Sequence, residues 1–312
     1  MYLGIDVGSV STDLVVIDEK YNVLCDVYLP TAGDPISAIK KGLKEIKERL
    51  GEVKIKGVGT TGSGRMLAGI VVGADIVKNE ITAHAVAAIH YVPDVQTVIE
   101  IGGQDSKIII IRDGVPVDFA MNTVCAAGTG SFLDHQAHRL GIPIENFGEM
   151  ALKANAPTRI AGRCTVFAES DMIHKQQIGH TKENIIAGLC HALVRNYLAN
   201  VAKGKEILPK VVFQGGVAAN KGMKAAFEEA LGMEVIVPPY HKVMGAIGAA
   251  MLAKEYTNGY TNFKGFEITT KDFTPKSFIC KDCPNECEIV EIWSGERLLA
   301  RWGSICGKWN VI

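Results

Sequence analysis

The feature that most constrains the fold is a strand–turn–strand pattern that occurs twice in the chain. Near the start, an apolar strand, a Gly/Ser turn and a second apolar strand are read from "LGIDVGSVSTDLVVID", and a third β-rich run follows in "VLCDVYLP". Further along, the same three runs recur in "VIEIGGQDSKIIIIRDG" and "VPVDFAM", with "IDVG" matched by "IEIG". The repeat predicts two similar α/β halves rather than one irregular domain.

Helical periodicity fills the segments between these strands. Apolar residues follow a 3.6-residue period in "DPISAIKKGLKEIKERLG", where Asp34 can cap the start, Pro35 suits the first turn and Gly51 can close the end. Four more helices are predicted, in "VKNEITAHAVAAIHYV", "KENIIAGLCHALVRNYLANVAK", the part of "KVVFQGGVAANKGMKAAFEEALG" after its Gly turn, and "HKVMGAIGAAMLAKEY".

Composition excludes several classes of protein. The 312 residues include 33 Lys and Arg against 34 Asp and Glu, a formal net charge of −1, so no basic field attracts nucleic acid. No apolar run is long enough to span a membrane and no signal peptide is evident, which predicts a cytoplasmic location without membrane association. Eight cysteines in such a chain are expected to be reduced, so metal or redox use is favoured over disulfides.

The two repeated turns carry the first chemistry. Each turn places glycine where backbone amides can approach a phosphate. Asp6 in the first turn, and Gln104 and Asp105 in the second, offer side-chain oxygens suited to Mg²⁺ and a water molecule. One such turn usually marks only a hairpin, but the repeated pair followed by "FQGGVAAN" favours a polyphosphate site.

Three motifs in matching order resemble those of a large superfamily. These are "GIDVGSVST", "EIGGQDSK" and "VVFQGGVAAN", which resemble the two phosphate motifs and the adenosine motif of the acetate and sugar kinase, heat-shock chaperone and actin superfamily. The resemblance covers about residues 1–255 and implies two ribonuclease-H-like (actin-like ATPase) domains with an ATP cleft between them. We therefore predict residues 1–92 as domain I, 93–240 as domain II, which carries the cluster cysteines named below, and 241–258 as a helix returning to domain I. Residues 259–312, outside the resemblance, are predicted to form a Cys-rich metal-binding extension.

Within that superfamily, three further segments narrow the match. "NTVCAAGTGSF", "AGRCTVFAESD" and "GTTGSGR" resemble the ATP-dependent activators of 2-hydroxyacyl-CoA dehydratases, a family related to benzoyl-CoA reductase ATPase subunits. The resemblance implies a homodimer in which Cys125 and Cys164 of each subunit hold one shared [4Fe-4S] cluster. A cubane needs four thiolates, and two symmetric copies can supply them. The alternative is that both are buried structural thiols, as we expect for Cys25 and Cys190.

The last cysteines pose a separate problem. Cys280, Cys283 and Cys287 are closely spaced, Cys306 follows, and four thiols in a short segment predict a metal site. Structural Zn²⁺ is slightly favoured over a second iron–sulfur cluster. The activators do not need this segment, so it can mark a branch that serves a double-cubane cluster protein. The portion "WSGERLLARWGSICGKW" predicts a small β-hairpin.

The sequence therefore predicts an ATP-dependent one-electron reductase. A ferredoxin- or flavodoxin-like donor would reduce the cluster, and the acceptor would be an iron–sulfur enzyme such as a 2-hydroxyacyl-CoA dehydratase, a benzoyl-CoA reductase-like enzyme or a double-cubane protein. Gln104 would orient the attacking water, while Asp6 and Asp105 would serve Mg²⁺. Gly128 is expected to approach the cluster. The expected contacts to ATP or ADP are Gly8, Ser9, Ser11, Thr12, Gly102, Gly103, Gln104, Gly215, Gly216 and Val217. Thr12 has an alternative role in satisfying its own turn.

Two other functions stay open at this stage. One is a small-molecule kinase of the same superfamily, acting on a sugar or carboxylate, in which the cysteines are structural. The other is an ATP-regulated binding module with a zinc knuckle. The three hypotheses predict different metals, because only the reductase needs iron.

Overall fold

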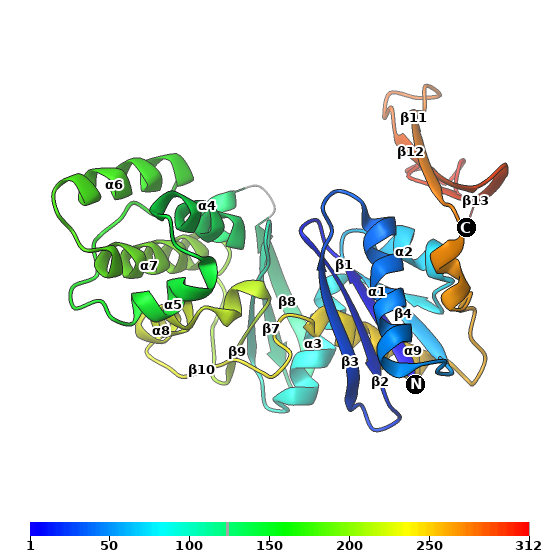
Figure 1. Cartoon of the computed structure of the whole chain (residues 1–312), viewed down its shortest axis with the longest axis horizontal. Coiled ribbons are helices and arrows are strands. Elements are labelled where there is room, and N and C mark those ends of the chain that lie inside the picture. Colours follow the sequence, from blue (N-terminus) through cyan, green and yellow to red (C-terminus); the bar gives the residue numbers. More distant parts are fainter. Residues whose placement is uncertain (123–124, 312) are drawn as a thin grey trace. The chain divides into compact units, whose positions relative to one another are not determined.

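The computed structural model describes residues 1–122 and 125–311, so Thr123 and Val124 of the "NTVCAAGTGSF" segment lie outside the described residues. The chain forms two compact units, which we call unit 1 (residues 1–83 and 245–312) and unit 2 (residues 84–244). One boundary falls within α3 (Glu80–Tyr91) and the other at the start of α9 (Met244–Tyr256), the predicted returning helix (Figure 1).

Unit 1 contains a five-stranded sheet in the order β3-β2-β1-β4-β5. Its strands are β1 (Tyr2–Val7), β2 (Ser11–Ile17), β3 (Val23–Pro30), β4 (Gly57–Thr61) and β5 (Ile76–Val77). The first three strands pair antiparallel, and β4 and β5 add in parallel to β1. Strand β1 pairs with β2 and β4, and β2 pairs with β1 and β3, so both strands that flank the β1–β2 turn are held from two sides.

Unit 2 repeats this sheet in the order β10-β9-β6-β7-β8. Its strands are β6 (Thr97–Ile101), β7 (Ser106–Arg112), β8 (Val115–Asn122), β9 (Val211–Gln214) and β10 (Val235–Ile236). Three antiparallel strands are again followed by two parallel ones, so β6 occupies the position of β1 and β9 that of β4. The predicted duplication of the α/β fold is confirmed.

The helix after β3 forms as the capping residues predict. Helix α1 (Pro35–Leu50) begins after Asp34, whose carboxylate accepts from the Ser37 amide at 3.0 Å, and it ends at Gly51 with φ 75°. Its apolar face is buried against the first sheet. The other unit 1 helices are α2 (Arg65–Val72), α9 and the short η3 (Phe266–Thr270), whereas most of α3 lies in unit 2.

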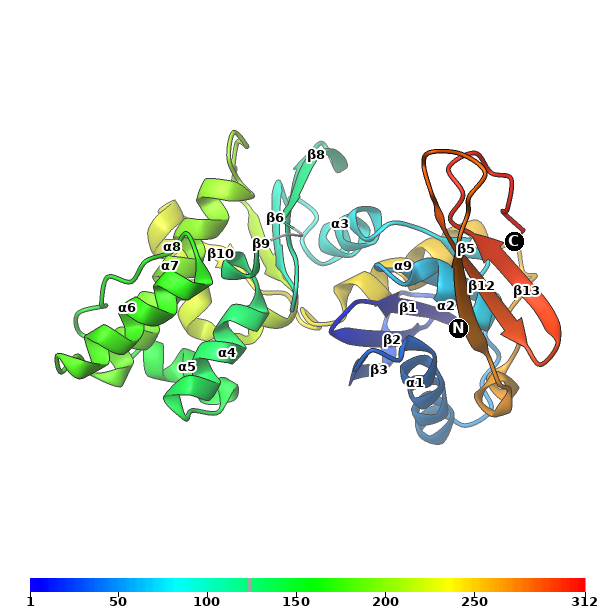
Figure 2. The same ribbon diagram turned by 90° about the horizontal axis from the view of Figure 1, so that it is seen from above.

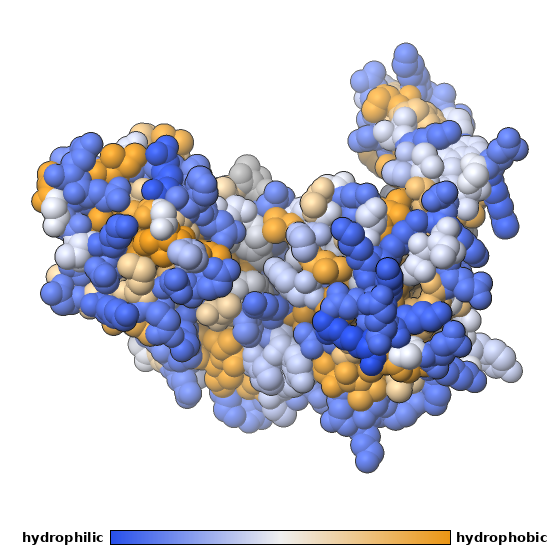
Figure 3. Space-filling view, in the orientation of Figure 1, coloured by the Kyte–Doolittle hydropathy of each residue, from blue (hydrophilic) through white to orange (hydrophobic). Residues whose placement is uncertain are grey.

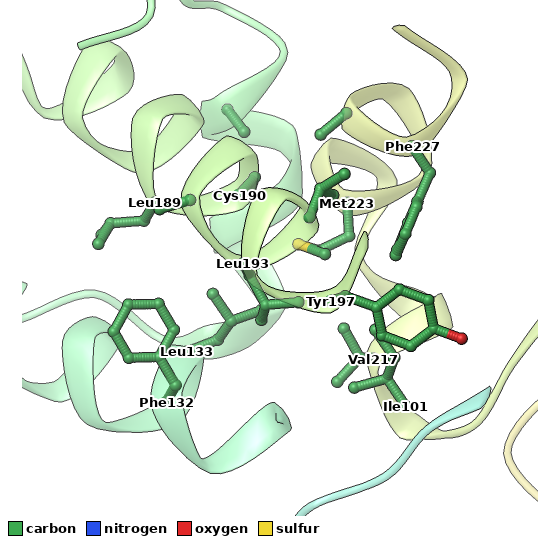
Figure 4. Packing of buried hydrophobic residues seen from close by; sticks show 14 of the residues in the cluster. Ile101, Phe132, Leu133, Leu189, Cys190, Leu193, Tyr197, Val217, Met223 and Phe227 are labelled. Carbon is green, nitrogen blue, oxygen red and sulfur yellow. The ribbon is translucent and has the colours of Figure 1, made fainter. Parts of the chain in front are cut away.

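The helices of unit 2 enclose a large apolar core. They are η1 (Ala126–Gly128), α4 (Gly130–Leu140), α5 (Ile144–Ala151), α6 (Thr165–Gln177), α7 (Lys182–Asn200), η2 (Gly216–Ala219) and α8 (Lys221–Leu231). Tyr197 of α7 meets Phe227 of α8 edge-to-face at 5.4 Å (Figure 4). Cys190 lies in this core and Cys25 in that of unit 1, which confirms both as packed thiols.

The C-terminal segment adds a third, separate sheet to unit 1. Strands β11 (Thr274–Ile279), β12 (Glu288–Ser294) and β13 (Arg297–Trp302) pair antiparallel in sequence order, which confirms the predicted hairpin (Figure 2). Asp75 anchors the segment that leads to it, since its carboxylate accepts from the Thr261 hydroxyl and the Asn262 amide, both at 2.7 Å. Among the described residues, no helix could cross a membrane.

Candidate nucleotide and cluster site

The first glycine turn is closed by its own backbone. The Gly8 amide donates to the Ser11 carbonyl at 2.8 Å, and Ser9 is exposed. Thr12, by contrast, is fully buried, with its hydroxyl 2.9 Å from that of Thr31. This contact fits the alternative in which Thr12 satisfies its own turn, and its role in nucleotide binding stays a prediction, while Gly8 and Ser11 are partly exposed.

A second loop of unit 1 crosses the end of β1, where Asp6 lies. Gly62 has φ 88°, and a Cβ there would lie 2.3 Å from Asp6 Oδ1. The Gly64 amide donates to the Val7 carbonyl at 2.9 Å. The "GTTGSGR" segment is thus the loop after β4, and its glycines allow the chain to pass directly over the Asp6 carboxylate.

The second glycine turn, in unit 2, has the same geometry as the first. The Gly102 amide donates to the Asp105 carbonyl at 3.0 Å, in the place of the Gly8–Ser11 bond. Gln104, at the tip of the turn, is exposed. Asp105 is partly exposed and its carboxylate pairs with Lys107 Nζ at 2.9 Å.

A buried ion triad supports this turn, and sequence reasoning missed it. Lys107 Nζ also lies 3.0 Å from Glu100 Oε2, and both of these side chains are 5% exposed. Burial opposes the charge on the amine, but Glu100 and then Asp105 outweigh it, so the pKa of Lys107 is raised. Two signals were present: Glu100 holds the repeat position of Asp6, and Lys107 interrupts an isoleucine-rich strand.

The predicted adenosine turn lies against the same strand end. Gly215 has φ 91°, and a Cβ there would lie 2.4 Å from the Ile101 carbonyl oxygen and 2.7 Å from Glu100 Oε1. Gly216 begins η2, and Val217 is buried in the unit 2 core. The structure thus brings the Gly102–Asp105 and Gly215–Gly216 turns together, with Val217 as packing beneath them.

A buried neutral pair lies next to this turn. His84 Nδ1 lies 2.9 Å from Gln214 Nε2, and both side chains are buried. Burial, and then the charge of Lys107, lowers the pKa of His84 to about 3. The imidazole is therefore neutral near pH 7, and it accepts a hydrogen bond from the side-chain amide of Gln214, the residue before Gly215.

The segment around Cys125 is bonded to the second glycine turn. The Asn122 side chain brackets Cys125, donating to its carbonyl at 2.7 Å and accepting from its amide at 3.0 Å. At the start of α4, the Gly130 amide donates to the Gly102 carbonyl at 2.8 Å. The amide and hydroxyl of Ser131 donate to the Gly103 carbonyl at 2.8 and 2.5 Å.

Cys164 immediately precedes α6, where free backbone amides and the helix dipole favour negative charge. Asn196 of α7 links the two cysteine segments. Its Nδ2 donates to the Gly162 carbonyl at 2.6 Å, and its Oδ1 would lie 2.9 Å from a Cβ on Gly128. The close approach that Gly128 permits is therefore to Asn196.

A cavity of about 1000 Å³ opens beside Cys164. Its charged lining consists of four cations and one carboxylate, namely Arg159, Arg163, Lys175, Arg195 and Asp171. Burial, and then the charge of Arg159, lowers the pKa of Arg195. The excess of positive charge suits an anionic group next to this thiol.

Apolar side chains are exposed on the same helix. Val166 and Phe167, directly after Cys164, are 66% and 67% exposed, and Ile178 at the end of α6 is 56% exposed. Figure 3 shows hydrophobic residues gathered on the surface over α6. Exposed apolar residues clustered on one helix are typical of a protein–protein contact.

The C-terminal cysteines lie around the loop between β11 and β12. The Cys280 amide donates to the Cys287 carbonyl at 2.8 Å, and the Trp309 indole N–H lies 3.2 Å from Cys280 Sγ. Cys283 and Cys306 are exposed. Within residues 1–122 and 125–311, no three His, Cys, Asp or Glu side chains gather closely enough to hold a metal ion, so the four-thiol site stays a prediction.

Comparison with known proteins identifies the family. Residues 3–253 match the model of the BadF/BadG/BcrA/BcrD ATPase family. The chain belongs to this family. Residues 254–312, with the C-terminal sheet, lie outside the matched range.

Curated and solved relatives agree with this assignment. The chain is 38% identical over 254 residues to the (R)-2-hydroxyglutaryl-CoA dehydratase activating ATPase of Acidaminococcus fermentans, covering 80% of this chain and 96% of the relative. The activator of the 2-hydroxyisocaproyl-CoA dehydratase from Clostridium difficile, solved with bound ADPNP, matches with a TM-score of 0.75 and 30% identity, over 82% of this chain and 95% of that one. The resemblance found in the sequence is confirmed.

A more distant structure supports the superfamily fold alone. The ethanolamine utilization protein EutJ from Carboxydothermus hydrogenoformans matches with a TM-score of 0.55 at 18% identity, over 80% of this chain and 89% of that one. The duplicated sheets of units 1 and 2 are the shared architecture.

Proposed function

We propose that this chain is an ATP-dependent one-electron reductase of the activator type. Two copies would share one [4Fe-4S] cluster through Cys125 and Cys164 of each subunit, and MgATP hydrolysis would drive an electron to an iron–sulfur partner. The named activities of the relatives support the activator role. A cluster supplies one-electron storage when it is bound.

One observation carries the proposal: the start of α4 is hydrogen-bonded to the predicted phosphate turn. Gly130 and Ser131 donate three hydrogen bonds to the carbonyls of Gly102 and Gly103, and Cys125 lies a few residues before them. A γ-phosphate that draws the turn toward itself would move the helix start with it. The geometry thus offers a direct route from nucleotide to thiol.

The thiols suit a cluster shared across a two-fold axis. A single chain offers only two cysteines here, fewer than a cubane requires. Cys164 precedes a helix and borders a cavity with four cations, both of which favour an anionic group. The exposed Val166 and Phe167 would be covered by the second subunit.

On the nucleotide side, we assign roles by position in the two turns. Gly8, Ser9, Ser11, Gly102 and Gly103 would hold phosphates, and Gly215 and Gly216 would border the adenosine. Asp6 and Asp105 would serve Mg²⁺ and its waters, with Asp105 fixed by Lys107. Gln104 would orient the attacking water, which favours a slow ATPase over a kinase.

We also propose the partners and the division of the chain. The donor would be ferredoxin- or flavodoxin-like, and the acceptor a 2-hydroxyacyl-CoA dehydratase, a benzoyl-CoA reductase-like enzyme or a double-cubane protein, all in the cytoplasm. Residues 1–92 and 93–240 would be the two ATPase domains, 241–258 the returning helix and 259–312 the metal-binding extension.

Metal analysis after anaerobic purification tests this proposal. We expect about four irons and four sulfides per dimer, lost in Cys125→Ser and in Cys164→Ser but retained in Cys283→Ser. Zinc lost with Cys283 would support the predicted structural zinc, and additional iron lost with it a second cluster. Iron-free wild type after reconstitution would overturn the reductase and favour a small-molecule kinase.

A further inference from the structure

We propose that the seam between α2 and the C-terminal sheet binds a small phosphate monoester with an apolar substituent. A cavity of about 500 Å³ lies there, within unit 1. Three cations line it, Lys264, Lys271 and Arg297, together with Ser294. This site goes beyond the proposed function, because the three cations lie after residue 253, where the family match ends.

The three positive charges come from separate parts of the segment. Lys264 precedes η3, Lys271 follows it, and Arg297 begins β13. None of them forms a salt bridge with a carboxylate of the described residues, whereas other cations of the unit, such as Arg49 and Arg301, do. Burial, and then the charges of Lys271 and Arg297, lowers the pKa of Lys264.

Two of the cations have their donors free for a ligand. Lys264 Nζ donates to the Ile70 carbonyl in the last turn of α2, so it has one protein partner. Lys271 and Arg297 make no side-chain hydrogen bond to the described residues. A phosphate dianion with its three terminal oxygens matches three cations better than a single carboxylate does.

The rest of the lining selects against a bare anion. Its apolar part comes from α2, β5 and the C-terminal sheet, namely Met66, Ile70, Ala74, Val77, Phe273, Leu299 and Ala300. The volume of about 500 Å³ falls in the range of small-molecule sites, roughly 300–1000 Å³. A phosphate at the cations would leave this apolar space for an organic substituent.

Phenyl phosphate is the probe, titrated by calorimetry into full-length protein saturated with MgADP, so that the nucleotide site is occupied. Lys271→Gln/Arg297→Gln should weaken binding at least tenfold. Lys54→Gln/Lys281→Gln removes the same charge from exposed residues outside the cavity, and it should bind as wild type does. We leave Lys264 unchanged because it also caps α2, and thermal melting should show both variants folded.

Inorganic phosphate at matched ionic strength tests the apolar part of the proposal. It should bind at least tenfold more weakly than phenyl phosphate. Equal binding of phenyl phosphate by the two double variants would overturn the site, and so would an absence of binding to wild type. Equal affinity for the two probes would overturn the ester and leave a site for free phosphate. None of these outcomes depends on iron or on ATP hydrolysis, so the proposed function fails or stands separately.

Discussion

Gly215 lies where any side chain would collide with the neighbouring strand. We expect Gly215→Ala to abolish nucleotide binding, because its Cβ would meet the Ile101 carbonyl at 2.4 Å. Gly265→Ala is the matched control, since Gly265 has nearly the same backbone conformation (φ 77°, ψ 172°, against φ 91°, ψ 175° at Gly215) but has nothing within 4 Å of its Cβ. Both changes carry the backbone cost of a side chain in this conformation, about 1–3 kcal/mol, and Gly215→Ala should lose about 1–3 kcal/mol more. Urea denaturation and nucleotide titration measure this, and equal losses in the two variants would refute the clash.

Lys107 is the only cation of its triad, so its removal leaves the buried Glu100 carboxylate beside the partly exposed Asp105 carboxylate without a counter-ion. Lys107→Met should lower the free energy of unfolding by about 3–5 kcal/mol. Adding Glu100→Gln should restore part of that loss, because the second buried charge is then removed. A raised pKa keeps Lys107 charged in the folded state up to strongly alkaline pH, so this loss should not vary near pH 7. A double variant less stable than Lys107→Met would contradict the triad.

His84 makes the free energy of unfolding depend on pH in the acid range. Its pKa is about 3 in the folded chain against 6.5 in the unfolded chain, so the unfolded chain binds the proton first. Stability is fully present above pH 6.5 and falls by about 1.4 kcal/mol per pH unit until about pH 3. The stability difference between wild type and His84→Gln should therefore shrink by about 2 kcal/mol from pH 7 to pH 5. Urea denaturation at both pH values measures it, and a constant difference would show that His84 does not titrate in this way.

At the scale of elements, helix α6 directly follows the proposed cluster ligand Cys164 and carries an exposed apolar surface. If α6 lies at the contact between two subunits, Phe167→Asp should weaken the affinity of dimerisation at least tenfold, because it places a charge where apolar area is buried. Tyr260→Asp is the control, because Tyr260 is 91% exposed and lies in the connecting segment. Sedimentation velocity under anaerobic conditions compares them. A dimer unaffected by Phe167→Asp would exclude this helix from the contact.

The antiparallel strands of both halves could be predicted from the sequence because alternation and glycine turns are local signals. The caps of α1 were local as well. Strand β4, by contrast, is "GVGTT", with too few bulky residues to show a pattern. Its Gly59 lies against the backbone of α9, where a Cβ would be 2.1 Å from the Ala249 carbonyl oxygen. Only the tertiary fold explains why small residues are needed there.

The site was predictable to a similar extent. The turns at Gly8, Gly102 and Gly215 followed from motifs, but the bonds from Gly130 and Ser131 to the second turn join residues far apart in sequence. Asn196 presented no signal either, since a lone asparagine on a helix is usually solvated. The internal repeat could have indicated Glu100, as the counterpart of Asp6.

At the scale of the whole molecule, the proposed coupling can be given an energy scale. Three hydrogen bonds join α4 to the predicted phosphate turn, and each is worth about 0.5–1.5 kcal/mol. One electron moved through 100 mV corresponds to about 2.3 kcal/mol. Rearranging these bonds on nucleotide binding is therefore sufficient, in magnitude, to shift the potential of a cluster at Cys125 by the order of 100 mV.

Ser131→Ala isolates part of that coupling. It removes the hydroxyl bond to Gly103 but keeps the backbone bond and both cysteines. We expect iron content and MgATP affinity to stay within about twofold of wild type, and the response of the cluster to nucleotide to be reduced. Ser170→Ala removes a hydroxyl bond within α6 and serves as the control. If the response of the cluster to nucleotide were unchanged in Ser131→Ala, the Ser131 hydroxyl would have no part in the coupling.

The most direct test of the central claim is the midpoint potential of the cluster in the wild-type dimer, measured by EPR-monitored titration with MgADP and with a non-hydrolysable MgATP analogue. If the nucleotide turn and the cysteine segments are coupled as proposed, the potential will be more negative with the ATP analogue. The same potential in both nucleotide states, in protein that binds both nucleotides, would contradict the account.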